Sequence, residues 1–357
     1  MRPAGRRYPP SPPEEHASTH DARDFVRAAL VAFDHACAAA SGSSTRSYRL
    51  AGAMIDVRYA GEALPRRFDT ALAPFTEPTQ PGPGLTISCW DRSSVDVAPP
   101  SPPWSLNDFL PRGRVRGFDS GDVRANYDAH FGILNLYDAR ARQAVYFAQD
   151  AGRIPPWIER APFRAVLGWW ATDRGLAVVH ASAVGSSDGC VLITGPSGSG
   201  KSTTALACVS GGFEIVGDDV AFVALEPEPT AFATTAVAKL EATSPVPVDR
   251  LGAAVLKTVG DQMMLGLGDR LLPSAPVRAV IGAAIGSGSR TSALPMTPGA
   301  CFRALAGHSV VEALAGDRRP LLALRELARR VPAYAVTLGS DLDGVVTTVR
   351  AILEGAA

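Results

Sequence analysis

Cysteine is scarce in this sequence, and the few cysteines form no recognisable pattern. Cys37, Cys89, Cys190, Cys208 and Cys301 are scattered, with no Cys-x-x-Cys pair and no histidine at metal-ligand spacing. Disulfide frameworks and zinc sites need such pairs, so this distribution argues against both. It fits a reducing compartment best, and we therefore expect a cytoplasmic protein.

Excess charge and long apolar runs are also absent. The 35 basic and 35 acidic residues cancel, so nothing electrostatic draws the whole chain to nucleic acid or to an anionic membrane surface. No apolar run reaches the roughly 20 residues that a membrane helix needs, and the N-terminus lacks the apolar centre of a signal peptide. We therefore expect neither nucleic acid nor a membrane as a partner, and we leave open whether the chain forms a homo-oligomer.

The chain of 357 residues has room for two domains, and its composition changes along its length. Residues 1–45 predict a flexible N-terminal segment with one helix, at 22–40, where apolar residues recur at helical spacing. Residues 46–160 contain short apolar or alternating runs between Pro/Gly clusters, which predicts a smaller α+β or β-rich domain. Residues 161–357 are more regular and predict an α/β catalytic domain.

The regular part alternates strands and helices. The predicted order is a helix at 158–172, strands at 176–184 and 190–194, a helix at 201–210, strands at 213–216 and 220–225, and a buried strand at 277–285. Trp169 and Trp170 lie in the first of these helices. Aromatic residues at helical spacing usually pack in a core, so we interpret this pair as core rather than as a base-stacking platform.

The strongest motif is Gly195-Pro-Ser-Gly-Ser-Gly-Lys-Ser-Thr203, which matches G-x-x-x-x-G-K-[ST] throughout. Its context also matches, because an apolar β-branched run, 191–194, precedes it and a helical run closed by Gly211 and Gly212 follows it. A glycine-rich turn without function is the alternative. The complete order of strand, loop, lysine-serine and helix favours a phosphate-binding loop.

Each residue type in this loop has a physical role. The glycines let the backbone wrap closely round an anion, and successive N–H groups with the positive end of the next helix form an anion nest. Lys201 is expected to neutralise the β- and γ-phosphates of ATP or GTP, and the Ser202 hydroxyl to bind magnesium. The predicted nucleotide-binding residues are Gly195, Pro196, Ser197, Gly198, Ser199, Gly200, Lys201, Ser202 and Thr203.

Two adjacent carboxylates, Asp218 and Asp219, follow the strand at 213–216. We expect that strand to lie beside the strand of the phosphate loop, so that its end opens at the same edge of the sheet. Because side chains alternate along an extended chain, one carboxylate can face magnesium while the other faces an acceptor. The second is a candidate general base for a hydroxyl nucleophile, unless Asp219 only caps a turn.

His180 lies in the apolar run 178–184, which we interpret as a strand that forms a hairpin with the phosphate-loop strand. A lone histidine on an apolar strand is usually a satisfied core residue. Its predicted position next to the nucleotide site makes a catalytic or phosphate-sensing role the alternative.

The residues from His180 to Leu225 combine into a familiar pattern. His-Ala-Ser-Ala-Val, then Gly-Pro-Ser-Gly-Ser-Gly-Lys-Ser-Thr, then Gly-Asp-Asp-Val resembles the catalytic domain of HPr serine kinase/phosphorylase. It is more similar still to the HPr-kinase-like proteins of bacterial biosynthetic clusters, some of which phosphorylate peptides. The short spacing from Lys201 to the acid pair is typical of that family. The resemblance implies a P-loop kinase fold related to phosphoenolpyruvate carboxykinase.

The resemblance also implies roles for individual residues. It implies that Ser202 and Asp218 contact magnesium, that Asp218 or Asp219 deprotonates the acceptor, and that His180 lies near the transferred phosphate. Together with Lys201, these are the predicted catalytic residues. Thr203 stands where the bifunctional enzymes commonly carry an acidic residue, and this difference argues against phosphorylase activity.

These observations predict an ATP- and magnesium-dependent kinase that phosphorylates a hydroxyl, preferentially a serine of a protein or peptide. A kinase for a sugar or another small metabolite would use the same site and differ only in the acceptor. A nucleotide-dependent switch ATPase is the alternative from another class. It would need an arginine finger, and Arg318, Arg319, Arg329 and Arg330 are candidates, although a solvated helix face explains them better.

Overall fold

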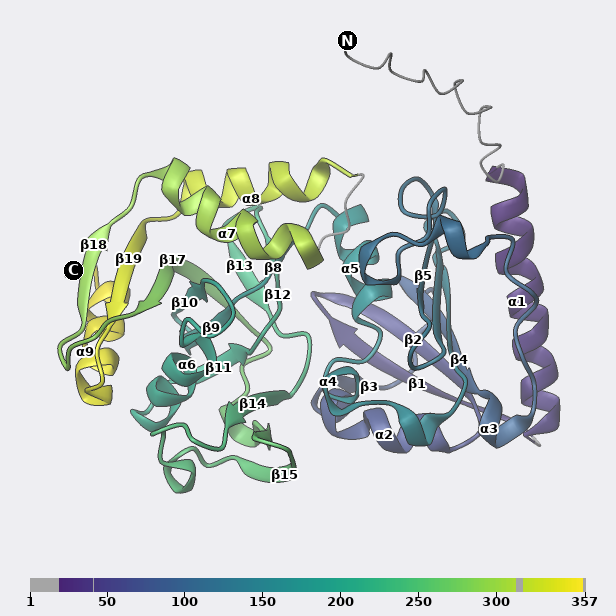
Figure 1. Cartoon of the computed structure of the whole chain (residues 1–357), viewed down its shortest axis with the longest axis horizontal. Coiled ribbons are helices and arrows are strands. Elements are labelled where there is room, and N and C mark those ends of the chain that lie inside the picture. Colours follow the sequence, from purple (N-terminus) through teal and green to yellow (C-terminus); the bar gives the residue numbers. More distant parts are fainter. Residues whose placement is uncertain (1–18, 41, 313–316, 356–357) are drawn as a thin grey trace, which may run out of the picture.

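The computed structural model describes residues 19–40, 42–312 and 317–355, and it has a mixed α/β architecture (Figure 1). Residues 1–18 of the predicted flexible segment lie outside the described residues. The helix predicted at 22–40 is α1, Thr19–Ala39, and the first strand begins at Ser43, inside the predicted segment 1–45. Within the described residues, no helix is both long and apolar enough to span a membrane.

The first sheet has seven strands in the order β3-β1-β2-β4-β7-β6-β5. The strands are β1 Ser43–Leu50, β2 Ala53–Ala60, β3 Thr76–Glu77, β4 Leu85–Asp91, β5 Val123–Asp128, β6 Ile133–Asp138 and β7 Gln143–Ala148. Helix α1 covers one face, and α2, Ala63–Leu72, covers the other; the short α3, Arg92–Val95, follows β4. Alternate residues of β4 supply the two cores, since Leu85 and Ile87 pack on the α2 side and Trp90 on the α1 side.

The second sheet has nine strands along the path β11-β9-β10-β17-β13-β12-β8, and β17 continues to β19 and β18. The strands are β8 Ala177–Val179, β9 Ser182–Ser186, β10 Gly189–Thr194, β11 Glu214–Gly217, β12 Ala221–Ala224, β13 Thr230–Phe232, β17 Ser274–Ile285, β18 Ser292–Pro295 and β19 Ala333–Leu338. Helices α6, Lys201–Ser210, and α9, Leu342–Leu353, cover one face. Helices α7, Pro298–Glu312, and α8, Arg319–Arg330, cover the other.

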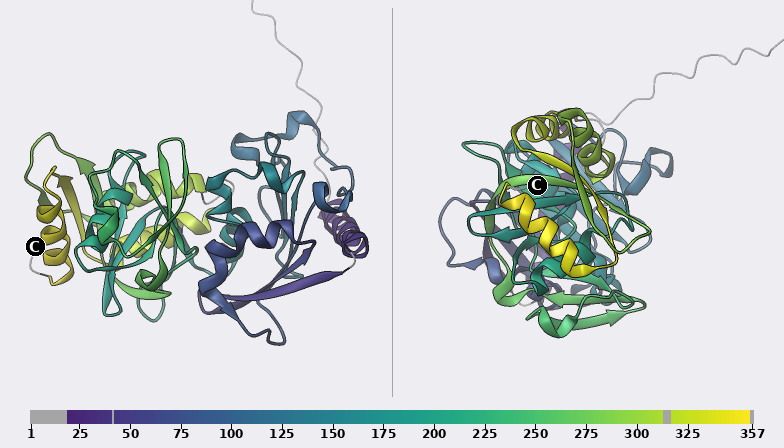
Figure 2. Two further views of the ribbon diagram at one scale, coloured as in Figure 1. Left: turned by 90° about the horizontal axis from the view of Figure 1, so that it is seen from below. Right: turned by 90° about the vertical axis from the view of Figure 1, so that its left-hand side faces the viewer.

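A third, small sheet lies next to the second. It has the order β14-β16-β15, with β14 Val237–Glu241, β15 Ala254–Val259 and β16 Gln262–Gly266. Its strand β14 contacts α6. Figure 2 shows the two large sheets in separate lobes along the long axis, with α1 at one end and the C-terminal helix α9 at the other.

Helix α5, Arg164–Asp173, lies between the lobes and contacts β6 of the first sheet and β8 of the second. The prediction of one helix at 158–172 is wrong, because the short α4, Pro156–Glu159, ends before α5 begins. Pro162 cannot donate the hydrogen bond that would continue the helix, and Phe163 has a left-handed backbone with φ of 59°. The interpretation of Trp169 and Trp170 as core is confirmed, since each is only 2% exposed.

Two predictions about neighbouring strands are also wrong. The run 176–184 is not one strand, since β8 ends at Val179 and pairs with β12, whereas β9 begins at Ser182 and pairs with β10 and β11. His180 therefore lies in the connection between two strands. The strand before the acid pair, β11, does not lie beside β10, because the β9–β10 hairpin puts β9 between them. The predicted strand at 277–285 is part of the longer β17, which runs parallel to β10.

Candidate functional site

The glycine-rich loop 195–200 connects the end of β10 to the start of α6. Gly198 and Gly200 have φ of 78° and 88°, a left-handed conformation that side chains disfavour. Gly195 lies against β17, where an added Cβ would come within 2.7 Å of the Ala283 carbonyl oxygen. Helix α6 begins directly after the loop, as the N–H of Thr204 donates to the Gly200 carbonyl at 2.8 Å. The free N–H groups of the first turn of α6 therefore belong to the same concave segment.

Gly195→Ala should lower the free energy of unfolding by about 1–3 kcal/mol, because the methyl group would overlap a backbone carbonyl that cannot turn away. Urea denaturation of the two proteins measures this difference. Gly198→Ala is the control, because its backbone also has positive φ but nothing lies within 4 Å of the added Cβ. Equal stability of the two variants would contradict the close approach of Gly195 to β17.

Lys201 is the first residue of α6, and its side chain folds back under the loop. Its Nζ donates to the carbonyl oxygens of Gly195 at 2.9 Å and Pro196 at 3.1 Å. Burial lowers the pKa of Lys201, and the nearby charges of Asp219 and Asp218 only partly offset that effect. The ammonium group thus lies at the centre of the loop, where a phosphate bound by the loop would meet it.

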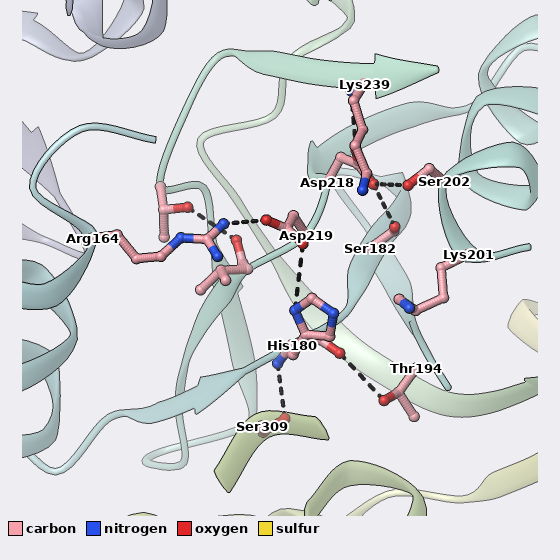
Figure 3. A network of polar contacts seen from close by, with 12 residues as sticks. Arg164, His180, Ser182, Thr194, Lys201, Ser202, Asp218, Asp219, Lys239 and Ser309 are labelled. Atoms are coloured by element: carbon pink, nitrogen blue, oxygen red, sulfur yellow. Dashed lines mark hydrogen bonds and ion pairs between the residues drawn. The ribbon is translucent and has the colours of Figure 1, made fainter. Parts of the chain in front are cut away.

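Ser202 and Asp218 lie side by side beneath the loop (Figure 3). The Ser202 hydroxyl donates to Asp218 Oδ1 at 2.8 Å, and the Ser182 hydroxyl of β9 donates to the same oxygen at 2.8 Å. The other oxygen, Oδ2, accepts the backbone N–H of Lys239 at 3.1 Å. Strands β9 and β14 therefore fix this carboxylate, which is only 1% exposed.

The pair Ser202 and Asp218 fits a magnesium ion by the chemistry of its donor atoms. Magnesium prefers hard oxygen ligands and usually takes one or two from the protein, with the rest from water and from substrate phosphates. The described residues contain no group of three or more His, Cys, Asp or Glu side chains that could hold a metal by themselves. This donor set accordingly suits a metal that arrives with a phosphate ligand.

Asp219 is held by a different set of partners from those of its neighbour (Figure 3). Its Oδ2 accepts from Arg160 Nη2 at 2.8 Å and from Arg164 Nη2, and its backbone has φ of 88°. Burial alone would raise the pKa of Asp219, but the charges of Arg164, Arg160 and His180 outweigh it and hold the pKa far below its ordinary value. Asp219 is therefore a carboxylate throughout the neutral pH range.

His180 is fixed by its backbone and points its ring at Asp219 (Figure 3). Its N–H donates to the Ser309 hydroxyl of α7 at 2.8 Å, and its carbonyl accepts from the Thr194 hydroxyl at 3.3 Å. The ring Nδ1 lies 3.4 Å from Asp219 Oδ1. The two side chains form a carboxylate–imidazole pair beside the loop.

A pocket of about 260 Å³, here called the loop pocket, brings most of the predicted residues together. Its lining consists of His180, Ser197, Gly198, Gly200, Lys201, Ser202, Thr203, Asp219, Lys239, Leu240, Glu241 and Gln262. Gly195, Pro196, Ser199 and Asp218 do not line it, although Asp218 accepts a hydrogen bond from Ser202, which does. A ligand in this pocket would thus contact the Lys201 ammonium group, the Ser202 hydroxyl and the Asp219–His180 pair.

Three residues of the site were not predicted from the sequence, namely Ser182, Arg160 and Arg164. Ser182 lies in the quoted His-Ala-Ser run, so its position two residues after His180 was a usable signal. The two arginines stand in a segment predicted as an ordinary helix, and nothing local marks them. Lys239 also lines the loop pocket, whereas Lys257 pairs with Glu159 and lies elsewhere.

The arginines considered as fingers lie on or next to α8, and none of the four lines the loop pocket. Arg319 pairs with Asp173 at 2.9 Å, and Arg330 pairs with Glu226 at 2.8 Å. Both therefore have structural contacts on the α8 side of the sheet. These contacts do not favour the switch-ATPase interpretation.

Comparison with known proteins adds little to this geometry. No family model and no curated protein matches the chain. Among solved structures, the Hpr(Ser) kinase/phosphatase from Coxiella burnetii is similar over 50% of this chain and 94% of that chain, with 14% sequence identity and a TM-score of 0.28. A likeness at this level establishes neither a family nor a function, so the functional conclusion has to come from the site itself.

Proposed function

We propose that this protein is an ATP- and magnesium-dependent kinase that transfers the γ-phosphoryl group to a hydroxyl, with a serine of a peptide or protein as the acceptor. The observation that carries the proposal is the arrangement around the loop pocket. Lys201 and the Ser202–Asp218 contact lie on the side of the glycine-rich loop, and the Asp219–His180 pair lines the same pocket. Phosphoryl transfer needs these two sides, one for the phosphates and one for the attacking hydroxyl.

On the phosphate side, the loop N–H groups and Lys201 would bind the β- and γ-phosphates of the nucleotide. Ser202 and Asp218 would hold the magnesium ion, which when bound supplies positive charge against the phosphate oxygens. Both oxygens of Asp218 are already engaged by Ser182, Ser202 and the N–H of Lys239. We therefore assign Asp218 to this side and not to proton transfer.

On the acceptor side, the bond from the hydroxyl oxygen to the γ-phosphorus forms while the bond from that phosphorus to the bridging oxygen breaks, and ADP leaves. The hydroxyl proton goes to the Asp219–His180 pair. Asp219 stays ionised and orients the imidazole, and imidazole is the side chain that most readily exchanges protons near neutral pH. The pair thus serves as one proton acceptor, whose two members act together.

Transfer of label from γ-labelled ATP tests the proposal. The purified protein with magnesium and serine-containing peptides should place label on a serine, located by mass spectrometry, and Lys201→Ala should reduce this labelling by about 10³-fold or more. Ser199→Ala is a matched control, because it changes the same loop without removing charge.

Two other outcomes of this experiment would contradict the proposal. Label on a sugar or another small hydroxyl compound, with none on peptides, would make the protein a metabolite kinase with the same site. Release of free phosphate at a rate that no acceptor changes would make it a switch ATPase, and the Asp219–His180 pair would lose its role as proton acceptor.

A further inference from the structure

A second cavity, of about 240 Å³, lies between the first sheet and the segment that carries α4 and α5. Figure 1 shows these two helices at the junction of the two lobes. The lining that matters here consists of Arg112, Arg114, Arg160, Arg164, Tyr146 and Trp157, and we call the space the arginine cavity. Its residues come from both the first sheet and the connection to the second, so the cavity belongs to the junction and not to either sheet alone.

Two side chains that line the arginine cavity bury polar atoms for which the described part of the chain provides no hydrogen-bond partner. They are Nε and Nη1 of Arg160, a residue that is 6% exposed, and the hydroxyl of Tyr146, which is 1% exposed. Burying a donor without a partner costs free energy, and the cost is largest when the donor is charged. Such groups point to a ligand that accepts hydrogen bonds.

The charges around the arginine cavity favour an anion as that ligand. Four guanidinium groups line it, against the single carboxylate of Asp128, whose Oδ1 already accepts the N–H groups of His130 and Phe131. Asp119 pairs with Arg114 at 3.8 Å, and Asp219 pairs with Arg160 and Arg164, but neither carboxylate lines the cavity. Guanidinium groups bind carboxylates and phosphates through paired hydrogen bonds, which single cations do not provide.

Arg160 and Arg164 connect this cavity to the loop pocket. Both bind Oδ2 of Asp219, Arg160 through Nη2 at 2.8 Å, and Asp219 itself lines the loop pocket. Arg160 thus has one nitrogen on Asp219 and two for which the described residues provide no hydrogen-bond partner. A molecule held by the free side of Arg160 lies one side chain away from the proposed proton acceptor.

We infer that the arginine cavity is the acceptor subsite and that it takes a hydroxyl compound through an anionic group, a carboxylate or a phosphate, that the acceptor carries. That the bound ligand is the phosphoryl acceptor rests on the proposed function. The binding of an acidic ligand can be measured independently of that function. An acidic peptide and a small hydroxy acid offer the same anion to Arg160. The peptide agrees with the proposed function, whereas the hydroxy acid would make the protein a metabolite kinase with the same subsite.

Calorimetry without nucleotide tests the binding. The probes are two peptides of one length with a central serine, flanked by glutamates in one and glutamines in the other, and glycerate with glycerol as its neutral counterpart. We expect the glutamate peptide or glycerate to bind at least tenfold more tightly than its neutral counterpart. The stronger of the two acidic probes identifies the source of the anion.

Conservative variants locate the binding in this cavity. Arg160→Lys keeps a cation for Asp219 but removes the two unpaired donors. It should therefore lower the affinity for the acidic probe about tenfold or more. Arg66→Lys, at an exposed arginine of α2, is the matched control and should leave the affinity unchanged. Tyr146→Phe removes only a hydroxyl for which the described residues provide no partner, so the thermal stability should not change. The affinity for the acidic probe should fall about fivefold.

The inference is overturned if neither acidic probe binds more tightly than its neutral counterpart, or if Arg160→Lys and Tyr146→Phe bind the acidic probe as well as the wild type does. The result is different if the proposed kinase activity is wrong but the arginine cavity does bind an anion. The acidic probe then binds in an Arg160- and Tyr146-dependent manner, also in Lys201→Ala, although no label is transferred to it.

Discussion

Asp218→Asn is expected to lower kcat for phosphoryl transfer by about 10³-fold, which corresponds to about 4 kcal/mol of transition-state stabilisation. The amide keeps the shape of the carboxylate but loses the negative charge that we assign to the metal. The fold should persist, because the hydroxyls of Ser182 and Ser202 can accept a hydrogen bond from the amide as well as donate to a carboxylate. Single-turnover kinetics with labelled ATP, together with thermal unfolding of the variant, measure the two effects separately.

Ser182→Ala is the control for this prediction. It removes one of the two hydroxyls that donate to the same carboxylate oxygen but leaves Ser202 in place. Its kcat should fall by less than about tenfold, since one hydrogen bond is lost and no charge. If Asp218→Asn and Ser182→Ala lower kcat equally, the carboxylate acts by positioning the loop, and its assignment to magnesium is wrong.

Asp219→Asn is expected to destabilise the fold by about 3–5 kcal/mol, as well as to reduce activity. Arg160 is 6% exposed and has Asp219 as its charged partner, so removal of the carboxylate leaves a guanidinium charge buried without compensation. The backbone does not explain such a loss, because asparagine tolerates the positive φ of this position. Urea denaturation at neutral pH measures the difference in the free energy of unfolding.

The same ion pair predicts how stability depends on pH. The pKa of Asp219 in the folded protein is far below the value of about 3.9 that an unfolded aspartate has. Below that value, Asp219 of the unfolded chain takes up a proton, whereas Asp219 of the folded protein does not. The stability that Asp219 contributes is therefore present above about pH 4 and is lost progressively as the pH falls towards the folded pKa. The wild type should therefore lose stability between pH 5 and 3 faster than Asp219→Asn does.

Asp128→Asn is a useful comparison for both measurements. Among the residues that the structure describes, the hydrogen-bond partners of the Asp128 carboxylate are two backbone N–H groups in a turn, which an asparagine oxygen can also accept. Its stability should change by less than about 1 kcal/mol. If Asp219→Asn were no more destabilising than Asp128→Asn, the pairing with the two arginines would not have the energetic weight that their burial implies.

These two predictions separate the roles that the sequence left open. Asp218 and Asp219 lie in a bend after β11, and the backbone of Asp219 has a φ of 88°. The side chain of Asp218 meets the Ser202 hydroxyl, whereas that of Asp219 meets the arginine pair. The choice between Asp218 and Asp219 as proton acceptor depends on which neighbours each carboxylate meets. Those neighbours come from β9, α6, β14, the segment after α4 and the first residue of α5, which are separate elements of the chain.

The sequence by itself determined the glycine-rich loop, the strand before it and the helix after it. Their signals are local, since the glycines, the β-branched run and the helical run each act on the backbone within a few residues. The same holds for the burial of Trp169 and Trp170, which their helical spacing predicted. Lys201 and Ser202 were assigned to the site for this reason, and they do line the loop pocket.

Only the tertiary structure decided which side chains surround the acid pair. Arg160 and Arg164 stand 59 and 55 residues before Asp219 in the sequence, and both bind its carboxylate. Pro162 and the left-handed Phe163 interrupt the predicted helix between these two arginines. The β9–β10 hairpin separates β11 from β10 and brings Ser182 to Asp218. Contacts over such distances depend on the packing of whole strands and helices, and no local propensity encodes them.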